Sequence, residues 1–230
     1  MTDVEQEDAA AAFREILETV DDEIEDLATS GGITADTRGD LSVDTLLRIA
    51  RWRSVQSAVL YGDWADRQRV TGMDAEVALA AAWKAGRSVE QYEAVTDHLS
   101  SRGVDPEPVE YALHGETLQF MADLTDPVAR VTAGFVVAPK LRAVKDKQAT
   151  LVATGNADPQ TASLYRDTIV PPEEEAIERG KRLLSRYLDD DDTSAVKTVE
   201  ETADAFLEVT WKSQERAMDE TGDIDPKTIC

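Results

Sequence analysis

The chain has little of the chemistry that most metal sites and nucleophilic sites need. Its 230 residues include one cysteine, Cys230, and two histidines, His98 and His114. A single cysteine excludes an intrachain disulfide and a cysteine-rich metal cluster. The sequence also lacks a Gly-x-Ser-x-Gly motif, a phosphate-binding loop and a dinucleotide fingerprint, which removes the common signatures of hydrolases and nucleotide-binding enzymes.

Positive charge and long apolar runs are also scarce. Twenty-four basic residues stand against forty-seven acidic ones, and the formal net charge is −23 at pH 7. This balance excludes the broad basic surface that nucleic-acid-binding proteins use, and it disfavours contact with anionic membranes. No apolar run approaches the roughly twenty residues that span a bilayer, and residues 1–8 have no basic region typical of a signal peptide. We therefore expect a cytoplasmic protein with neither nucleic acid nor a membrane as its partner.

The acidic residues are spread along segments that also carry regularly spaced apolar positions. Sixteen arginines outnumber eight lysines. This distribution favours a packed domain with an acidic surface over a disordered acidic tail. The composition resembles that of proteins from salt-in extreme halophiles. This indicates a high-salt environment and says nothing about the chemistry that the protein performs.

Apolar residues recur with the helical period almost throughout, which predicts an all-α fold. Ser42 and Asp126 are expected to cap the helices that follow them. Pro139 should kink its helix, and the pair Pro171 and Pro172 should bend or break another. The main helices are predicted over residues 13–27, 42–69, 74–101, 126–154, 161–188 and 195–218.

Two segments, residues 90–99 (EQYEAVTDHL) and 171–184 (PPEEEAIERGKRLL), resemble helices of the ferritin-like, di-iron carboxylate superfamily. In that family two helices each give a Glu and two each give Glu-x-x-His. Here the last motif would read Glu173-x-x-Ala176, without its histidine. The chain resembles the non-catalytic subunits of multicomponent oxygenases such as phenylacetyl-CoA epoxidase. The resemblance implies a ferritin-like antiparallel four-helix bundle over residues 41–188, preceded by an acidic amphipathic helix and linker (1–40) and followed by a helix and acidic tail (189–230).

The resemblance also implies a place for each former ligand. Spacing from Glu173 and the position of Tyr92 give six vestigial ligand positions: Ser57, Ser88, Gln91, Lys140, Glu173 and Ala176. Crowded carboxylates in a core without metal would repel one another and lose their hydration, so neutral replacements suit a metal-free bundle. We expect Lys140 to pair with Glu173 inside the former cavity. The alternative is that Lys140 is a surface residue, because Pro139 disturbs the helical phase beside it.

These positions predict a metal-free protein without catalytic residues that acts as a structural or regulatory partner, as a homodimer or with a paralogous ferritin-like subunit. One alternative is an oxidoreductase, an oxygenase or oxidase, with iron at an atypical site built from Glu173 and His98, with Asp63 or Glu116. Another is an acidic mimic or salt-adapted binding module unrelated to ferritin. A bundle without metal could also hold a small molecule in its cavity.

Overall fold

The computed structural model describes residues 3–27, 32–71, 75–105, 115–188 and 193–221. All regular elements within these ranges are helical, which confirms the all-α prediction. No helix in the described ranges is long and apolar enough to cross a membrane. His114, Cys230 and residues 189–192 lie outside the described residues.

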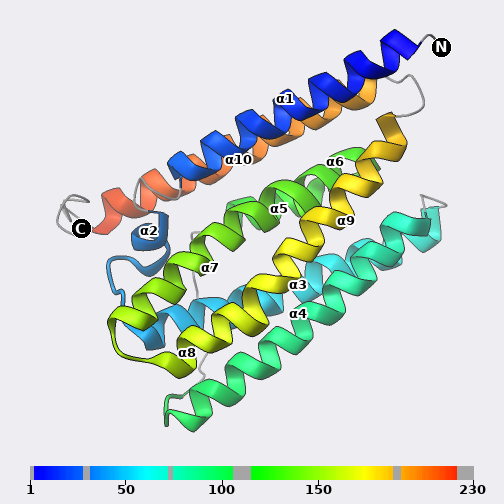
Figure 1. Ribbon diagram of the computed structural model, residues 1–230. Helices are drawn as coiled ribbons and strands as arrows, with labels where there is room; N and C mark the ends of the chain where they lie inside the picture. The colour runs from blue at the N-terminus through cyan, green and yellow to red at the C-terminus, as the bar shows by residue number, and fades with distance from the viewer. Residues whose placement is uncertain (1–2, 28–31, 72–74, 106–114, 189–192, 222–230) are drawn as a thin grey trace.

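Two antiparallel helix pairs form the centre of the molecule (Figure 1). Helix α3 (Val43–Thr71) packs against α4 (Ala75–Ser101), and α7 (Ala138–Gly155) packs against α9 (Val170–Leu188). Contacts between α3 and α7 and between α4 and α9 join the two pairs.

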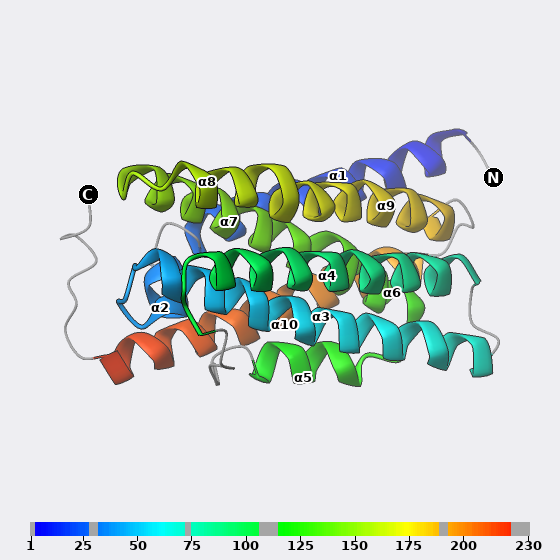
Figure 2. The same ribbon diagram turned by 90° about the horizontal axis from the view of Figure 1, so that it is seen from below.

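Three further helices cover one side of these pairs. Helix α1 (Asp3–Leu27) and helix α10 (Thr193–Thr221) lie side by side and run in the same direction (Figures 1 and 2). Helix α5 (Gly115–Asp123) lies along α10 and contacts α3. Helix α5 and the single-turn α2 (Ile33–Thr37) were not expected, because such short segments hold too few turns to display a clear period.

The predicted caps are confirmed at both helix starts. The Ser42 hydroxyl accepts a hydrogen bond from the Thr45 backbone N–H at 3.3 Å, and the Asp126 carboxylate accepts one from the Ala129 N–H at 2.9 Å. Asp126 is followed by a proline in the first turn of α6 (Pro127–Val131). Gly103, at φ +70°, ends the α4 segment where the sequence predicted an end. Local chemistry therefore fixes these boundaries.

The helices are not broken at the prolines, and the expected kink at Pro139 and bend at Pro171 and Pro172 stay predictions. Pro139 follows a π-helical segment, η3 (Thr132–Val137), and Pro171 and Pro172 follow another, η4 (Tyr165–Ile169), which continues α8 (Pro159–Leu164). A proline cannot donate to the carbonyl four residues before it. A π turn changes the hydrogen-bonding pattern at that point, so the helix continues through the prolines.

Side chains from the α3–α4 pair complete the hydrogen bonding of both π segments. The Tyr61 hydroxyl donates to the Gly134 carbonyl of η3 at 2.5 Å, and burial raises the pKa of this hydroxyl, which keeps its proton in place. The Gln91 side-chain amide donates to the Ile169 carbonyl of η4 at 2.9 Å. These bonds tie the two helix pairs together at the points where the helices deviate from α geometry.

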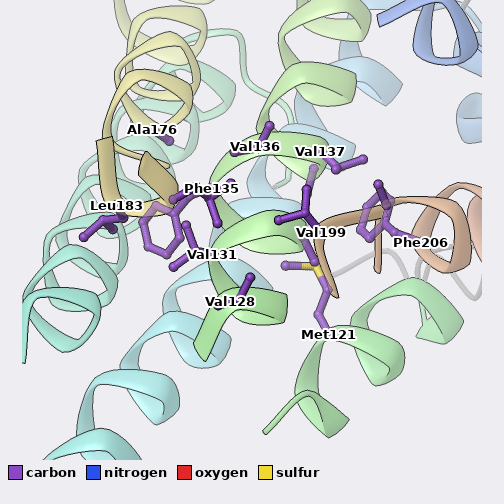
Figure 3. Close-up of a cluster of buried hydrophobic side chains, with 14 of the residues drawn as sticks. Met121, Val128, Val131, Phe135, Val136, Val137, Ala176, Leu183, Val199 and Phe206 are labelled. Carbon is purple, nitrogen blue, oxygen red and sulfur yellow. The ribbon is translucent and has the colours of Figure 1, made fainter. Parts of the chain in front are cut away.

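The core contains two apolar clusters. The larger cluster surrounds η3, where Phe135 lies beside Leu183 of α9 and Val137 lies on the side of Phe206 (Figure 3). The smaller cluster joins the opposite ends of the central helices; it consists of Val43, Leu46, Leu47, Ala50, Val95, Leu99, Ala149, Ala153, Ala162, Tyr165 and Ile169. Each central helix pair therefore runs from one apolar cluster to the other.

Candidate functional site

Polar side chains interrupt all four central helices between the two apolar clusters. We call this set the polar layer. It comprises Arg53 and Ser57 on α3, Lys84, Ser88 and Gln91 on α4, Arg142 and Asp146 on α7, and Glu173 on α9. Buried polar groups are costly unless they are paired, so their partners determine what this layer can do.

A lysine and a glutamate form the most deeply buried ion pair of the layer. The Lys84 ammonium lies 2.7 Å from Glu173 Oε1, and the side chains are 1% and 4% exposed. Burial lowers the pKa of Lys84, while the Glu173 carboxylate acts in the opposite direction. Lys84 therefore supplies the positive charge that balances the buried Glu173 carboxylate.

A second pair lies next to the first. Arg53 donates to Asp146, whose carboxylate is almost fully buried. Burial raises the pKa of the Asp146 carboxyl and Arg53 opposes that rise. Arg142 donates to the Ser57 hydroxyl at 2.8 Å. The layer is thus a network in which two carboxylates are surrounded by three cationic side chains.

A cavity of about 10 Å³ lies inside the network. Its walls include Arg53, Ser57, Arg142, Asp146 and Glu173. The second carboxylate oxygen of Glu173, Oε2, is buried and has no hydrogen-bond partner among the described residues. A cavity of this size has room for about one water molecule, which would satisfy that oxygen.

This donor set does not suit a di-iron centre. Such centres use several carboxylates and two histidines, whereas the cavity walls offer only Asp146 and Glu173, each already beside a cation. Within the described ranges, no three histidine, cysteine, aspartate or glutamate side chains gather closely enough to hold a metal. With Arg53, Lys84 and Arg142 ionised, the layer carries more positive than negative charge, which would repel a second cation.

The predicted ion pair between Lys140 and Glu173 is wrong. Lys140 binds Asp21 of α1 instead, and the partner of Glu173 is Lys84. Two residues correspond to about 200° around an α-helix, so Lys140 points away from the layer that Arg142 enters. Lys140 is also not an ordinary surface residue, because its side chain is only 10% exposed beside Asp21 of α1.

The other five predicted positions are all buried in this region. Ser57 accepts from Arg142, Ser88 donates to the carbonyl of Lys84 in its own helix, and Gln91 binds the Ile169 carbonyl. Glu173 is in the ion pair, and Ala176 belongs to the larger apolar cluster. Their descent from metal ligands stays a prediction.

The residues of the alternative iron site are not brought together. His98 Nε2 lies 2.8 Å from the Thr161 hydroxyl and does not line the cavity next to Glu173. Asp63 pairs with Arg67 four residues along α3, and Glu116 binds Arg216 and Ser213 of α10.

Sequence reasoning missed four charged members of the layer: Arg53, Lys84, Arg142 and Asp146. Each is a charged residue at a core-facing helical position, between the buried apolar residues of its own helix. That coincidence on three helices was the available signal. Comparison of the chain with known proteins gives no matching family model, curated protein or solved structure.

Proposed function

We propose that this chain is a metal-free, ferritin-like four-helix bundle that acts as a structural or regulatory partner subunit. The supporting observation is the buried pair of Lys84 and Glu173, 2.7 Å apart at the centre of the four helices. A lysine at this point neutralises the one carboxylate retained from the ligand pattern. The layer then holds the helices together without a metal, and the function resides on the surface.

Metal content tests the first half of the proposal. The protein, expressed with ample iron and purified at high salt, should contain far less than one iron or manganese per chain by elemental analysis. Near-stoichiometric metal that is lost in Glu173→Ala, and retained in the exposed neighbour control Glu174→Ala, would overturn it. That result would favour the competing oxidoreductase.

The partner surface is assigned to the groove between α4 and α9. This groove combines Leu79, which is 67% exposed, with Arg179, Arg182 and Arg186. Glu76 also lines the groove and pairs with Arg186, and Glu175 pairs with Arg179, so the three arginines leave a surplus of about one positive charge around the exposed leucine, on a chain of net charge −23. The acidic surface of a second copy complements this patch in charge, so we propose a homodimer, with a paralogous subunit of the same acidic character as the alternative.

Sedimentation equilibrium at high salt tests this assignment. The wild-type chain should have the mass of a dimer, and Leu79→Asp should shift it toward the monomer. The matched control is Leu151→Asp, which changes an equally exposed leucine on α7 and should leave the mass unchanged. A monomeric wild-type chain would overturn the homodimer.

A further inference from the structure

A second cavity lies on the other side of the polar layer, among α2, α3, α5, α7 and α10, and encloses about 50 Å³. Four charged side chains line it: Asp36, Arg53, Arg142 and Lys145. Arg53 and Arg142 also line the smaller cavity, so these two arginines form a wall shared by both spaces.

One of these cations lacks a carboxylate partner. Lys145 lies 2.9 Å from both carboxylate oxygens of Asp36, and Arg53 is paired with Asp146. Arg142 bonds to the neutral hydroxyl of Ser57, and no carboxylate of the described residues lies within ion-pair distance of it. The pocket therefore carries a surplus of about one positive charge, inside a chain of net charge −23.

The rest of the lining is mainly apolar. Leu118 and Met121 of α5, Leu141 of α7 and Phe206 of α10 form this apolar wall, and the hydroxyl-bearing Thr117 and Thr210 also line the pocket. A ligand that matches both walls has one negative charge at one end and a short hydrocarbon part at the other. At roughly 10–15 Å³ for each water-sized position, the space corresponds to a ligand of only about three to five non-hydrogen atoms.

We propose that this pocket binds a small monocarboxylate with a short alkyl body, such as propionate. The planar guanidinium of Arg142 matches a carboxylate in geometry and charge, and the apolar wall receives the alkyl group. A doubly charged anion would exceed the surplus charge and leave the apolar wall unmatched. The inference does not depend on the partner role proposed above, because it concerns the interior of a single chain.

Calorimetric titration of the full chain with sodium propionate, at constant chloride concentration, tests this inference. We expect saturable binding of one propionate per chain, and no saturable binding of propionamide, a neutral molecule of nearly the same shape. Equal binding of propionamide, tighter binding of inorganic phosphate, or no saturation up to about 100 mM propionate would each overturn the proposal.

Two variants localise the binding. Arg142→Gln keeps a donor for Ser57 and removes the charge, and we expect it to weaken propionate binding at least tenfold. Arg166→Gln is the matched control, because Arg166 is exposed on η4 beside Asp167 and lies outside the pocket. If Arg142→Gln fails to fold, Leu118→Trp fills the pocket from the half-buried helix α5 and should abolish binding. Unchanged affinity in a folded Arg142→Gln or in Leu118→Trp would overturn the assignment.

Discussion

The polar layer and the apolar clusters on either side of it are built by the same four helices, but they resist substitution in different ways. In the larger cluster, Phe135 and Leu184 are held by burial and shape, and each contact is individually weak. In the layer, Lys84 and Glu173 each depend on one partner. The comparison teaches that the loss of stability on changing a residue of the layer depends on the buried charge that is left without a partner. In a cluster, the loss of stability depends on the side-chain volume removed or added.

The largest effect is expected from separating a buried charge pair. Glu173→Leu leaves the Lys84 ammonium buried without its carboxylate, and should lower the free energy of unfolding by about 3–5 kcal/mol in chemical denaturation. The double variant Lys84→Met, Glu173→Leu removes both charges. It should recover most of this loss, because apolar pairs of similar volume often match or exceed buried ion pairs. If Glu173→Leu alone were as stable as the wild type, residues of the layer would not depend on their charge partners, and the distinction from the clusters would fail.

A smaller loss is expected from crowding the larger cluster. A Cβ atom added at Gly180 would lie 2.7 Å from the carbonyl oxygen of Phe135, the carbonyl to which Pro139 cannot donate. Gly180→Ala should therefore cost about 1–3 kcal/mol in the same denaturation experiment. The control is Gly86→Ala on α4, where no atom lies within 4 Å of the new Cβ. That change should stabilise the chain by about 0.5–1 kcal/mol, because alanine is the better helix former.

Acid titration separates carboxylates inside the layer from those at the ends of the helices that build it. The Thr45 hydroxyl and the Ser42 backbone N–H hold the pKa of Asp40 below its ordinary value. The stability that ionised Asp40 contributes is therefore fully present at pH values above the ordinary aspartate pKa. It is lost as the pH falls through the lower pKa that Asp40 has in the folded chain. Asp40→Ala should cost about 0.5–1.5 kcal/mol at neutral pH. The cost should fall toward zero once the pH lies below the folded-state pKa of Asp40.

The opposite sign applies to Asp146, because burial raises its pKa. Protonation of Asp146 in acid therefore does not remove stability in the way that protonation of Asp40 does. A cost of Asp40→Ala that stays constant from neutral pH to acid would contradict the assignment of these hydrogen bonds to the ionised carboxylate.

The smallest effect is expected at the residue next to Glu173. Glu174 pairs with Lys147 at 2.9 Å, nearly the distance of the buried pair, but both side chains are more than half exposed. Glu174→Gln should change the free energy of unfolding by about 0–1 kcal/mol, and less at high salt. A loss comparable to that of Glu173→Leu would show that burial is not what distinguishes the two pairs.

The helix boundaries were predictable because they depend on local chemistry. Ser42 and Asp126 act through bonds to backbone atoms three residues away, and Gly103 acts through its own φ angle. Such features need no knowledge of the rest of the fold. Helix continuity at Pro139 was not predictable in this way, because the π segment before it is stabilised by Tyr61 from another helix.

The candidate site was predictable only in part. A buried Glu173 paired with a lysine was expected, and the structure contains that pair with Lys84 in place of Lys140. The choice between two lysines depends on the axial and angular positions of three helices, and an error of a fraction of a turn exchanges a core position for a surface one. Pairings such as Arg53 with Asp146 join residues far apart in sequence, and helical periodicity carries no information about them.

The parallel contact of α1 with α10 sets an order of events during synthesis. Val20, Ile24 and Leu27 of α1 are buried in the folded chain, yet α10 begins only at Thr193. At about 5–20 residues per second, the ribosome exposes α1 for roughly ten seconds or more before α10 exists. The acidic residues between these apolar positions keep the waiting helix hydrated, and α1 can reach its final place only when nearly all the described chain has emerged.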